Sequence, residues 1–386
     1  TACQSGFQAA LMAPTEVLAA QHHRTIRHWL QPLGIEAELL TGSLTVRERQ
    51  SVYGGMQRGA IQVAVGTQAL IQASVSFQRL GLIVIDEQHR FGVLQRGSLR
   101  GKGRHPHVLV MTATPIPRTL AMTLYGDLDV SIIDGLPPGK KSILTRVLTE
   151  GQRSSAYRAV RQEVEQGRQV FIVYPLVEES EVLDLKDATR MAEHLKADVF
   201  PNCVVGLIHG RMAGTEKDIV MERFAKGEIQ ILVSTSVIEV GIDVPRASLM
   251  VIEHAERFGL SQLHQLRGRV GRGEIASACL LMVGKGVTLT ARRRLRIMAE
   301  SNDGFRIAEE DLAIRGPGEF MGTRQSGIPD FRVAHLLRDM SVLQAAKEEA
   351  FRVVSEDPTL THPRNEALRQ VLFRRWDGRL HLARTA

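Results

Sequence analysis

The chain has 386 residues, which is enough for two or three globular domains, each with its own hydrophobic core. Its formal charge of +7 suits a nucleic-acid partner without requiring one, and 44% hydrophobic residues is ordinary for a globular protein. Three scattered cysteines without a CxxC pair argue against a structural zinc site or a disulfide framework. No apolar run approaches the ~20 residues that span a membrane, and we expect a cytoplasmic protein with no membrane partner.

The first part of the chain alternates short apolar runs with amphipathic segments. The runs are rich in Val, Ile, Leu and Ala, as expected of strands that are buried on both faces. Alternation of such strands with helices predicts a parallel sheet covered by helices. The predicted strands are Gln8–Ala13, Ile61–Gly66, Leu82–Ile85 and Val108–Met111, and two predicted helices are Glu16–Leu30 and Val46–Gln57.

A second region of the same design follows the segment Gly135–Lys141, which contains two prolines, two glycines and two lysines. Proline and glycine at this density predict a linker between domains. The alternation of strands and helices then begins again, which predicts a second α/β domain of similar architecture. Its predicted strands are Val170–Tyr174, Val204–Ile208, Ile229–Val233, Leu249–Ile252 and Cys279–Met282, and its predicted helices include Asp187–Leu195, Thr215–Ala225 and Leu260–Gly268.

From about Gly286 onward the pattern changes to helices and polar segments. Arg292–Ser301 predicts a basic helix, and Leu336–Val353 predicts a further helix. The intervening segment Gly304–Gly327 is rich in Gly and Arg. We therefore expect two α/β domains and a helical C-terminal region, with boundaries at residues 1–140, 141–287 and 288–386.

The segment Leu82–His89 places two carboxylates, Asp86 and Glu87, directly after a buried strand. Ligands of open α/β sheets bind beyond the carboxyl ends of the strands. In nucleotide hydrolases an Asp at such a place holds Mg²⁺ through water, and the neighbouring Glu orients the attacking water. His89 would then lie close enough to sense the γ-phosphate. The alternative is that Asp86 and Glu87 begin a solvated turn.

A second predicted strand ends in small hydroxyl residues, Thr112 and Thr114. Such side chains can bond to backbone or phosphate groups and switch between two arrangements. The alternative is a simple Thr-Pro turn. One strand ending in Asp-Glu and the next ending in Thr-Ala-Thr, in that order, is the pattern of the superfamily 2 helicases.

The segment Gln265–Arg272 contains two arginines, Arg269 and Arg272, whose spacing predicts that both lie on one helical face. Two guanidiniums aimed across a cleft suit a phosphate whose charge grows in the transition state, which is an arginine-finger arrangement. The alternatives are a solvated basic face and a glycine-arginine patch that binds RNA. Apolar residues nearby argue against a free tail: Leu260, Leu263, Leu266 and Val270.

Weaker signals in the second domain follow two other predicted strands. Thr235 offers a hydroxyl to a nucleic-acid backbone, and Gly241 and Asp243 are candidates for the nucleotide cleft. His209 and Arg211 follow a different strand end, where they can contact a phosphate. Each of these signals is weak by itself.

The 386 residues contain no phosphate-binding loop of the form GxxxxGK[ST], in which backbone amides and a lysine hold the phosphates of a nucleotide. Lys102, Lys140 and Lys285 each follow a glycine, but the next residue is never Ser or Thr. The chemistry of a nucleotide cleft is therefore only half present. Either the chain never used ATP or its front end is absent, and we expect a truncated chain.

Together these segments resemble the RecG family of superfamily 2 DNA helicases. Ala13–Ala19 resembles motif Ia, Gly66–Gln68 resembles motif Ib, Asp86–His89 resembles motif II, and Met111–Met122 resembles motif III with its RecG extension. Asp311–Gly327 resembles the translocation motif that RecG shares with the transcription-repair coupling factor. The resemblance covers essentially the whole chain and implies a C-terminal motor fragment without the phosphate loop or the wedge domain.

The resemblance implies two tandem RecA-like domains, the first truncated, that close on ATP and Mg²⁺ and move along DNA. A helical hairpin would couple closure to movement. The residues expected in the catalytic site are Asp86 (also the Mg²⁺ residue, through water), Glu87, His89, Gln265, Arg269 and Arg272, and those expected to bind the cofactor are Thr112, Thr114, Gly241 and Asp243. The residues expected in DNA binding and coupling are Pro14, Thr15, Gly66, Thr67, His209, Arg211, Thr235, Arg315, Gly316, Gly318, Arg324 and Gln325.

We therefore expect an ATP-dependent helicase or translocase that remodels branched double-stranded DNA at stalled forks and Holliday junctions. It would act as a monomer in the bacterial cytoplasm, near the nucleoid, with a contact to single-strand-binding protein. This chain alone is expected to lack ATPase activity, and its first domain to be less stable than its second. Two alternatives stay open: a relative of the transcription-repair coupling translocase, and a DNA-binding fragment without catalysis.

Overall fold

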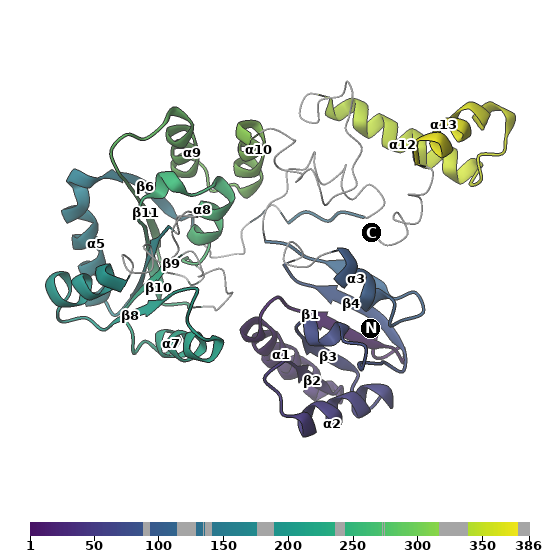
Figure 1. Cartoon of the computed structure of the whole chain (residues 1–386), viewed down its shortest axis with the longest axis horizontal. Coiled ribbons are helices and arrows are strands. Elements are labelled where there is room, and N and C mark those ends of the chain that lie inside the picture. The colour runs from purple at the N-terminus through teal and green to yellow at the C-terminus, as the bar shows by residue number, and fades with distance from the viewer. Residues whose placement is uncertain are drawn as a thin grey trace. The chain divides into compact units, whose positions relative to one another are not determined.

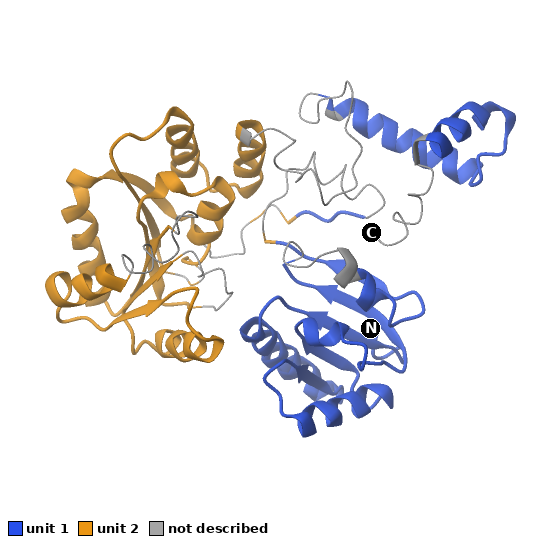
Figure 2. Ribbon diagram, viewed as in Figure 1, with its two compact units in different colours: residues 1–112, 116–132, 317–386 blue, residues 113–115, 133–316 orange. Residues whose placement is uncertain are grey.

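A computed structural model of the chain describes residues 1–87, 93–113, 129–133, 135, 141–175, 189–235, 244–271, 273, 275–315 and 339–376. The chain divides into two compact units (Figure 1; Figure 2). The first comprises residues 1–112, 116–132 and 317–386, and the second comprises residues 113–115 and 133–316. The domain boundaries at residues 140 and 287 stay predictions. In the described part of the chain, we find no helix with the length and apolar character needed to cross a membrane.

The first unit contains a five-stranded parallel sheet in the order β2-β3-β1-β4-β5. The central strand β1 pairs with β3 on one side and with β4 on the other. The elements of this sheet and its helices are β1 Gln8–Met12, α1 Glu16–Leu30, β2 Ala37–Leu40, α2 Val46–Gln57, β3 Val63–Gly66, the short helix η2 Gln68–Ile71, β4 Leu80–Ile85, α3 Val93–Arg100 and β5 His107–Val110.

Helices cover both faces of this sheet. Successive side chains of a strand point to opposite faces, and in the central strands both sets are apolar and need to be buried. Ala10 and Met12 of β1 pack in one cluster with Met56 of α2. Leu11, which lies between them, packs in another cluster with Ala19 of α1. The central strands of the sheet are therefore buried on both sides, as the continuous apolar runs predicted. For β5 the prediction is wrong, because its residues are mostly exposed at the end of the described sheet.

The second unit contains a six-stranded parallel sheet in the order β6-β11-β10-β7-β9-β8. Helices separate its consecutive strands along the chain, except between β9 and β10, where residues 236–243 lie outside the described residues. Parallel strands joined through helices are the pattern of right-handed crossover connections. The elements are β6 Leu144–Thr149, α5 Arg153–Glu165, β7 Gln169–Tyr174, the π-helical turn η5 Leu195–Val199, β8 Val205–Ile208, α7 Gly214–Lys226, β9 Ile231–Thr235, β10 Ala247–Ile252, α8 Leu260–Arg267, β11 Ala278–Val283, α9 Leu289–Glu300 and α10 Gly304–Arg315.

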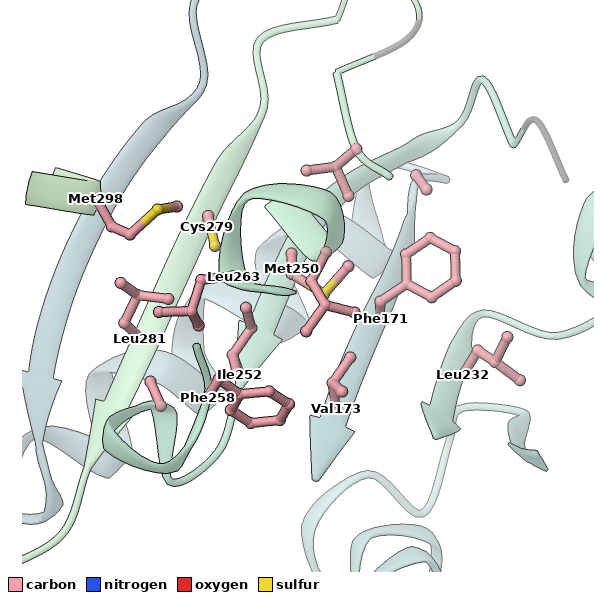
Figure 3. Packing of buried hydrophobic residues seen from close by; sticks show 14 of the residues in the cluster. Phe171, Val173, Leu232, Met250, Ile252, Phe258, Leu263, Cys279, Leu281 and Met298 are labelled. Carbon is pink, nitrogen blue, oxygen red and sulfur yellow. The ribbon is translucent and has the colours of Figure 1, made fainter. Parts of the chain in front are cut away.

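The core of the second unit is built from alternate residues of its central strands (Figure 3). Phe171 and Val173 of β7 lie in one cluster with Met250 of β10 and Leu263 of α8. The residues between them on β7 and β10 pack in a second cluster with helix α5. Both faces of this sheet are therefore covered by helices as well.

Two helices, α12 (Met340–Glu356) and α13 (Glu366–Trp376), form the C-terminal part of the described chain. Asp357 joins them, because its carboxylate accepts hydrogen bonds from Asn365 Nδ2 at 2.9 Å and from the backbone N–H of His362 at 2.8 Å. These hydrogen bonds, that of Asn365 above all, lower the pKa of Asp357 to about 2. The turn between the two helices is thus organised by one ionised side chain.

The structure confirms the predicted α/β fold of both units, with most strand ends shifted by one or two residues. Helices α1 and α2 have the predicted bounds. The predicted helix Asp187–Leu195 is helical from residue 189 and passes into η5, while residues 187 and 188 lie outside the described residues. Most of the predicted linker Gly135–Lys141 also lies outside them. Elements that the sequence reasoning missed include β2, β6, α5 and α13.

Gly66, the last residue of β3, must be glycine because the backbone of the neighbouring strand β2 comes too close to admit a side chain. A Cβ atom on Gly66 would lie 2.2 Å from the carbonyl oxygen of Leu40 in the neighbouring strand. We expect Gly66→Ala to lower the free energy of unfolding by about 1–3 kcal/mol, because the strand must move to admit the methyl group. Urea denaturation measures this change. Gly101→Ala is the control, since its nearest atom would lie 3.5 Å away, and an equal loss in both variants would contradict the prediction.

Strand β5 is predicted to be the least protected part of the first sheet. It is the last strand of the described sheet, and Val108 and Leu109 on it are 41% and 52% exposed. By contrast, all six residues of β10 are buried. Amide hydrogens of the first sheet, and of β5 in particular, should therefore exchange faster than those of the second sheet in a hydrogen-exchange experiment. Equal protection of the two sheets would show the expectation to be wrong.

Candidate functional site

The carboxyl ends of the strands in the first unit lie at one edge of the sheet because the sheet is parallel. Hydrogen bonds that continue past the last residues of the strands fix the residues that follow them. The backbone N–H of Asp86, after β4, donates to the carbonyl of Met12 at 2.9 Å. The N–H of Ala13, after β1, donates to the carbonyl of Gly66 at 2.8 Å. The predicted metal-binding carboxylate and the segment that contains Pro14 are thereby fixed at one edge.

Each carboxylate oxygen of Asp86 has a hydrogen-bond partner. The backbone N–H of Glu87 donates to Oδ1 at 2.9 Å, and Nε2 of His22 lies 2.8 Å from Oδ2. Because a carboxylate can only accept, Nε2 of His22 is the donor. The side chains of Asp86 and His22 are 20% and 29% exposed, so water and ions still reach the pair.

Glu87 adopts a left-handed backbone conformation, with a φ of 50°. A non-glycine residue in this region costs on the order of 1 kcal/mol, and such residues gather at functional sites. This conformation turns the chain sharply at the end of β4. Glu87 is partly buried and directly follows Asp86, so both carboxylates belong to the same strand end.

The donor set at this edge fits Mg²⁺ that is shared with a nucleotide. Mg²⁺ prefers oxygen ligands, keeps several waters, and is usually held by one or two carboxylates together with substrate phosphates. Asp86 and Glu87 supply carboxylate oxygens at a partly exposed strand end. They are therefore the described residues of the first unit that would hold the cation.

Four residues predicted to contact DNA lie at the same edge of the first sheet. Pro14 and Thr15 follow β1, and Thr15 caps α1 by accepting a hydrogen bond from the N–H of Leu18 at 3.3 Å. Gly66 ends β3, and Thr67 follows it. All but the buried Gly66 are partly exposed, and their contact with DNA stays a prediction. Thr112, the predicted cofactor residue after β5, is exposed.

The prediction that Arg269 and Arg272 share one helical face is wrong. Helix α8 ends at Arg267, and Arg269 lies in the turn that follows it. Gly271 then adopts a φ of 73°, a left-handed conformation that interrupts any helix. Gln265 lies on α8 as predicted, whereas Arg272 lies outside the described residues. Among the described residues of this segment, Arg269 is therefore presented from a turn and not from a helical face.

Arg267, which the sequence reasoning did not select, is a buried cation at the end of α8. Its Nη1 donates to the carbonyl oxygens of Met298 and Ser301 at 2.9 and 2.8 Å, and it also reaches Oγ1 of Thr145 at 3.4 Å. Burial lowers the pKa of this guanidinium. The cation interacts with the terminal carbonyls of α9, where the helix dipole is negative. The end of α8 is thereby tied to the end of α9.

Helix α8 is also bonded to α10, the helix that begins the predicted translocation motif. Oγ of Ser261 donates to Oδ2 of Asp311 at 2.9 Å, and Asp311 is buried. Arg315 ends α10, and its side chain lies outside the described residues. The segment that contains Gln265 is thus joined by polar contacts to both helices that follow the second sheet.

His209 and Arg211 follow β8 in a turn that lies beside Lys217 of α7. Nδ1 of His209 is buried without a hydrogen-bond partner among the described residues. Burial, and next the charge of Lys217, lower the pKa of His209. Lys217 itself donates to the carbonyl of Gly210 at 2.8 Å. Arg211 is exposed, so this turn presents positive charge to solvent.

Thr235, the last residue of β9, is fully buried. Its hydroxyl has no hydrogen-bond partner among the described residues, and its carbonyl accepts from Oγ of Ser234 at 2.5 Å. A contact between Thr235 and DNA would require this strand end to open, and it stays a prediction. The predicted site residues that lie outside the described residues are His89, Thr114, Gly241, Asp243, Arg272, Gly316, Gly318, Arg324 and Gln325.

Three protein families match separate parts of the chain. The family described as "DEAD/DEAH box helicase" matches residues 1–123, and "Helicase conserved C-terminal domain" matches residues 153–274. The family described as "ATP-dependent DNA helicase RecG, domain 3, C-terminal" matches residues 301–377. Together they cover both sheets and the C-terminal helices.

Two curated relatives are similar over nearly the whole chain. A protein of Synechocystis named ATP-dependent DNA helicase RecG is 56% identical over 363 residues, which are 94% of this chain and 44% of the relative. One of Acidithiobacillus ferridurans with the same name is 51% identical over 378 residues, 98% of this chain and 54% of the relative. The chain thus spans about half the length of these relatives.

A solved structure titled "Structure of RecG bound to three-way DNA junction" matches with a TM-score of 0.71 and 50% identity. The match covers 88% of this chain and 44% of that chain. These comparisons and the two parallel sheets define a superfamily 2 helicase with tandem RecA-like domains. Within that class, the chain belongs to the RecG family, as the resemblance implied.

The stability of the second unit should depend on His264, which lies on α8. Burial, and next the charge of Arg267, lower the pKa of His264 from 6.5 to about 4. The unfolded chain therefore binds a proton near pH 6.5, while the folded chain binds it only near pH 4. The free energy of unfolding should fall as the pH drops through this window, by on the order of 2–3 kcal/mol.

Urea denaturation between pH 7 and pH 4.5 measures this dependence on His264. His264→Gln should flatten the curve, because the substituted side chain does not titrate. His28→Gln, on the exposed side of α1, is the matched control. Parallel curves for the wild type and His264→Gln would contradict the role of His264.

Proposed function

We propose that the chain is the motor region of an ATP-dependent DNA helicase or translocase. It would remodel branched double-stranded DNA, such as stalled forks and Holliday junctions, in recombination and repair. The observation that carries this proposal is the carboxyl edge of the first sheet, where Asp86 and Glu87 follow β4 beside the end of β1. Membership of the RecG family supports it.

The proposed roles follow from the placement of the carboxylates and the α8 segment. Asp86 would hold Mg²⁺ through water, and Glu87 would orient the water that attacks the γ-phosphate. Mg²⁺ would neutralise the charge that develops on the phosphates. Gln265 and Arg269 would contact the phosphates of the nucleotide. His89 and Arg272, with the cofactor residues Thr112, Thr114, Gly241 and Asp243, are proposed on the family resemblance alone.

DNA would be held mainly through its backbone, by the strand-end residues of both units. The solved RecG relative is bound to a three-way DNA junction, and we propose branched double-stranded DNA as the partner of this chain. The contact between Ser261 and Asp311 offers a route from the α8 segment to α10 and the coupling residues. The proposed coupling residues beyond α10 are Gly316, Gly318, Arg324 and Gln325. We further propose a cytoplasmic monomer that contacts single-strand-binding protein.

A second candidate function is a DNA-binding fragment without catalysis. The observation that favours it is the absence of a GxxxxGK[ST] loop from these 386 residues, since a lysine on the β- and γ-phosphates is part of every cleft of this kind. In that case ATP hydrolysis would need a phosphate-binding loop in addition to this chain. Both candidates predict DNA binding, and neither predicts ATP hydrolysis by these 386 residues alone. They differ in whether the chain works as part of an ATP-driven motor.

The DNA contact of the second unit can be tested at Arg211. Fluorescence anisotropy with a labelled three-way junction, at several salt concentrations, gives the affinity and its salt slope. Arg211→Gln should weaken binding and reduce the salt slope by about one, because one phosphate contact is lost. Arg158→Gln, an exposed change on α5, is the control and should leave both unchanged. If the affinity of the wild-type chain for the junction did not change with salt concentration, the proposal would be contradicted.

A further inference from the structure

We propose that His22 is a positioning residue that holds the carboxylate of Asp86 in the orientation required for a divalent cation. This inference rests on the proposed function, because it assumes that Asp86 binds the cation. None of the segments that resemble helicase motifs includes His22, which lies in the second turn of α1. Its link to Asp86 comes from the fold, since 64 residues separate them along the chain.

The hydrogen bond from His22 sets the rotation of the Asp86 carboxylate. Oδ1 already accepts from the backbone N–H of Glu87, and Oδ2 accepts from Nε2 of His22, at 2.9 and 2.8 Å. One donor on each oxygen restricts the rotation of the carboxylate and leaves each oxygen a further lone pair with which to accept. Without His22, the group could turn about its last side-chain bond, because the torsional preference there is broad.

Helix α1 is a rigid support for His22. Ala19 is fully buried against the sheet, one turn before His22. Nε2 of His23 is 2.9 Å from the carbonyl of Ala37 in β2, and the carboxylate of Glu16 accepts from the N–H of Gly42 at 2.8 Å. The helix is therefore held to neighbouring segments along its first half. A donor that projects from such an element holds its partner more firmly than one on a loop.

A donor behind a metal-binding carboxylate affects affinity for the metal. Partners that orient metal ligands typically contribute about tenfold or more to metal affinity. His22 stands in this relation to Asp86, with its ring partly buried beside the strand end. The effect should appear in cation binding itself, without turnover of a nucleotide.

The experiment uses Mn²⁺ as the probe, since the electron paramagnetic resonance signal of the free ion reports binding. The difference between the wild-type chain and Asp86→Asn defines the ions bound at Asp86. His22→Phe should weaken this binding about tenfold, because it keeps a ring but removes the donor. His22→Gln should restore most of the affinity, since its amide nitrogen can replace Nε2.

The matched control is His23→Phe, which removes a hydrogen bond of the same kind from the same helix without touching Asp86. Thermal denaturation of each variant checks that it is folded. His23→Phe should bind Mn²⁺ as the wild type does. A merely structural role of His22 would instead give equal losses in His22→Phe and His22→Gln.

Two further outcomes separate failure of this inference from failure of the proposed function. If Asp86→Asn loses Mn²⁺ binding while His22→Phe retains the wild-type affinity, the positioning role is overturned and the metal role of Asp86 stands. If Asp86→Asn binds Mn²⁺ as the wild type does, Asp86 is not a metal residue, and the proposed cleft and this inference both fail.

Discussion

The hydrogen-bond ladder that continues past the ends of the central strands is the constraint on which the first unit depends. Asp86 and Ala13 both donate backbone hydrogen bonds to the neighbouring strand after their own strands have ended. In a parallel sheet all carboxyl ends lie at one edge, so these bonds bring distant segments of the chain to fixed positions there. Gly66 belongs to the same arrangement, because only hydrogen fits between it and the carbonyl of Leu40. A chemically demanding site can therefore be assembled from residues far apart in sequence.

The second unit depends on α8 in a comparable way. Its apolar residues lie in the core beside the central strands, while Arg267 and Ser261 bond to the end of α9 and to α10. A buried guanidinium is costly unless its donors are satisfied, so these bonds also fix where α8 ends. The turn that carries Arg269 begins at that end. The segment proposed to contact a phosphate thus depends on the same contacts that join α9 and α10 to α8.

Much of the fold followed from patterns in the sequence, and the parts that did not have physical reasons. The central strands were predictable because burial on both faces demands continuous apolar runs. The strands β2 and β6 were missed because each lies at the edge of its sheet and carries polar residues such as Glu38 and Arg146. Asp86 and Glu87 were found because they follow a central strand. His22 was not found from the sequence, because helical periodicity does not indicate which strand end a polar side chain of the helix faces.

The prediction of one helical face for Arg269 and Arg272 was wrong because their spacing alone does not show that Gly271 adopts a left-handed conformation.

The central claim is that this chain carries the water-positioning, arginine and coupling parts of a RecG-family motor without a phosphate-binding loop. Steady-state ATP hydrolysis by the 386-residue chain, with a three-way DNA junction, tests it most directly. We expect a rate no higher than background, for the wild type and Glu87→Gln alike. Robust turnover that Glu87→Gln abolishes would contradict it.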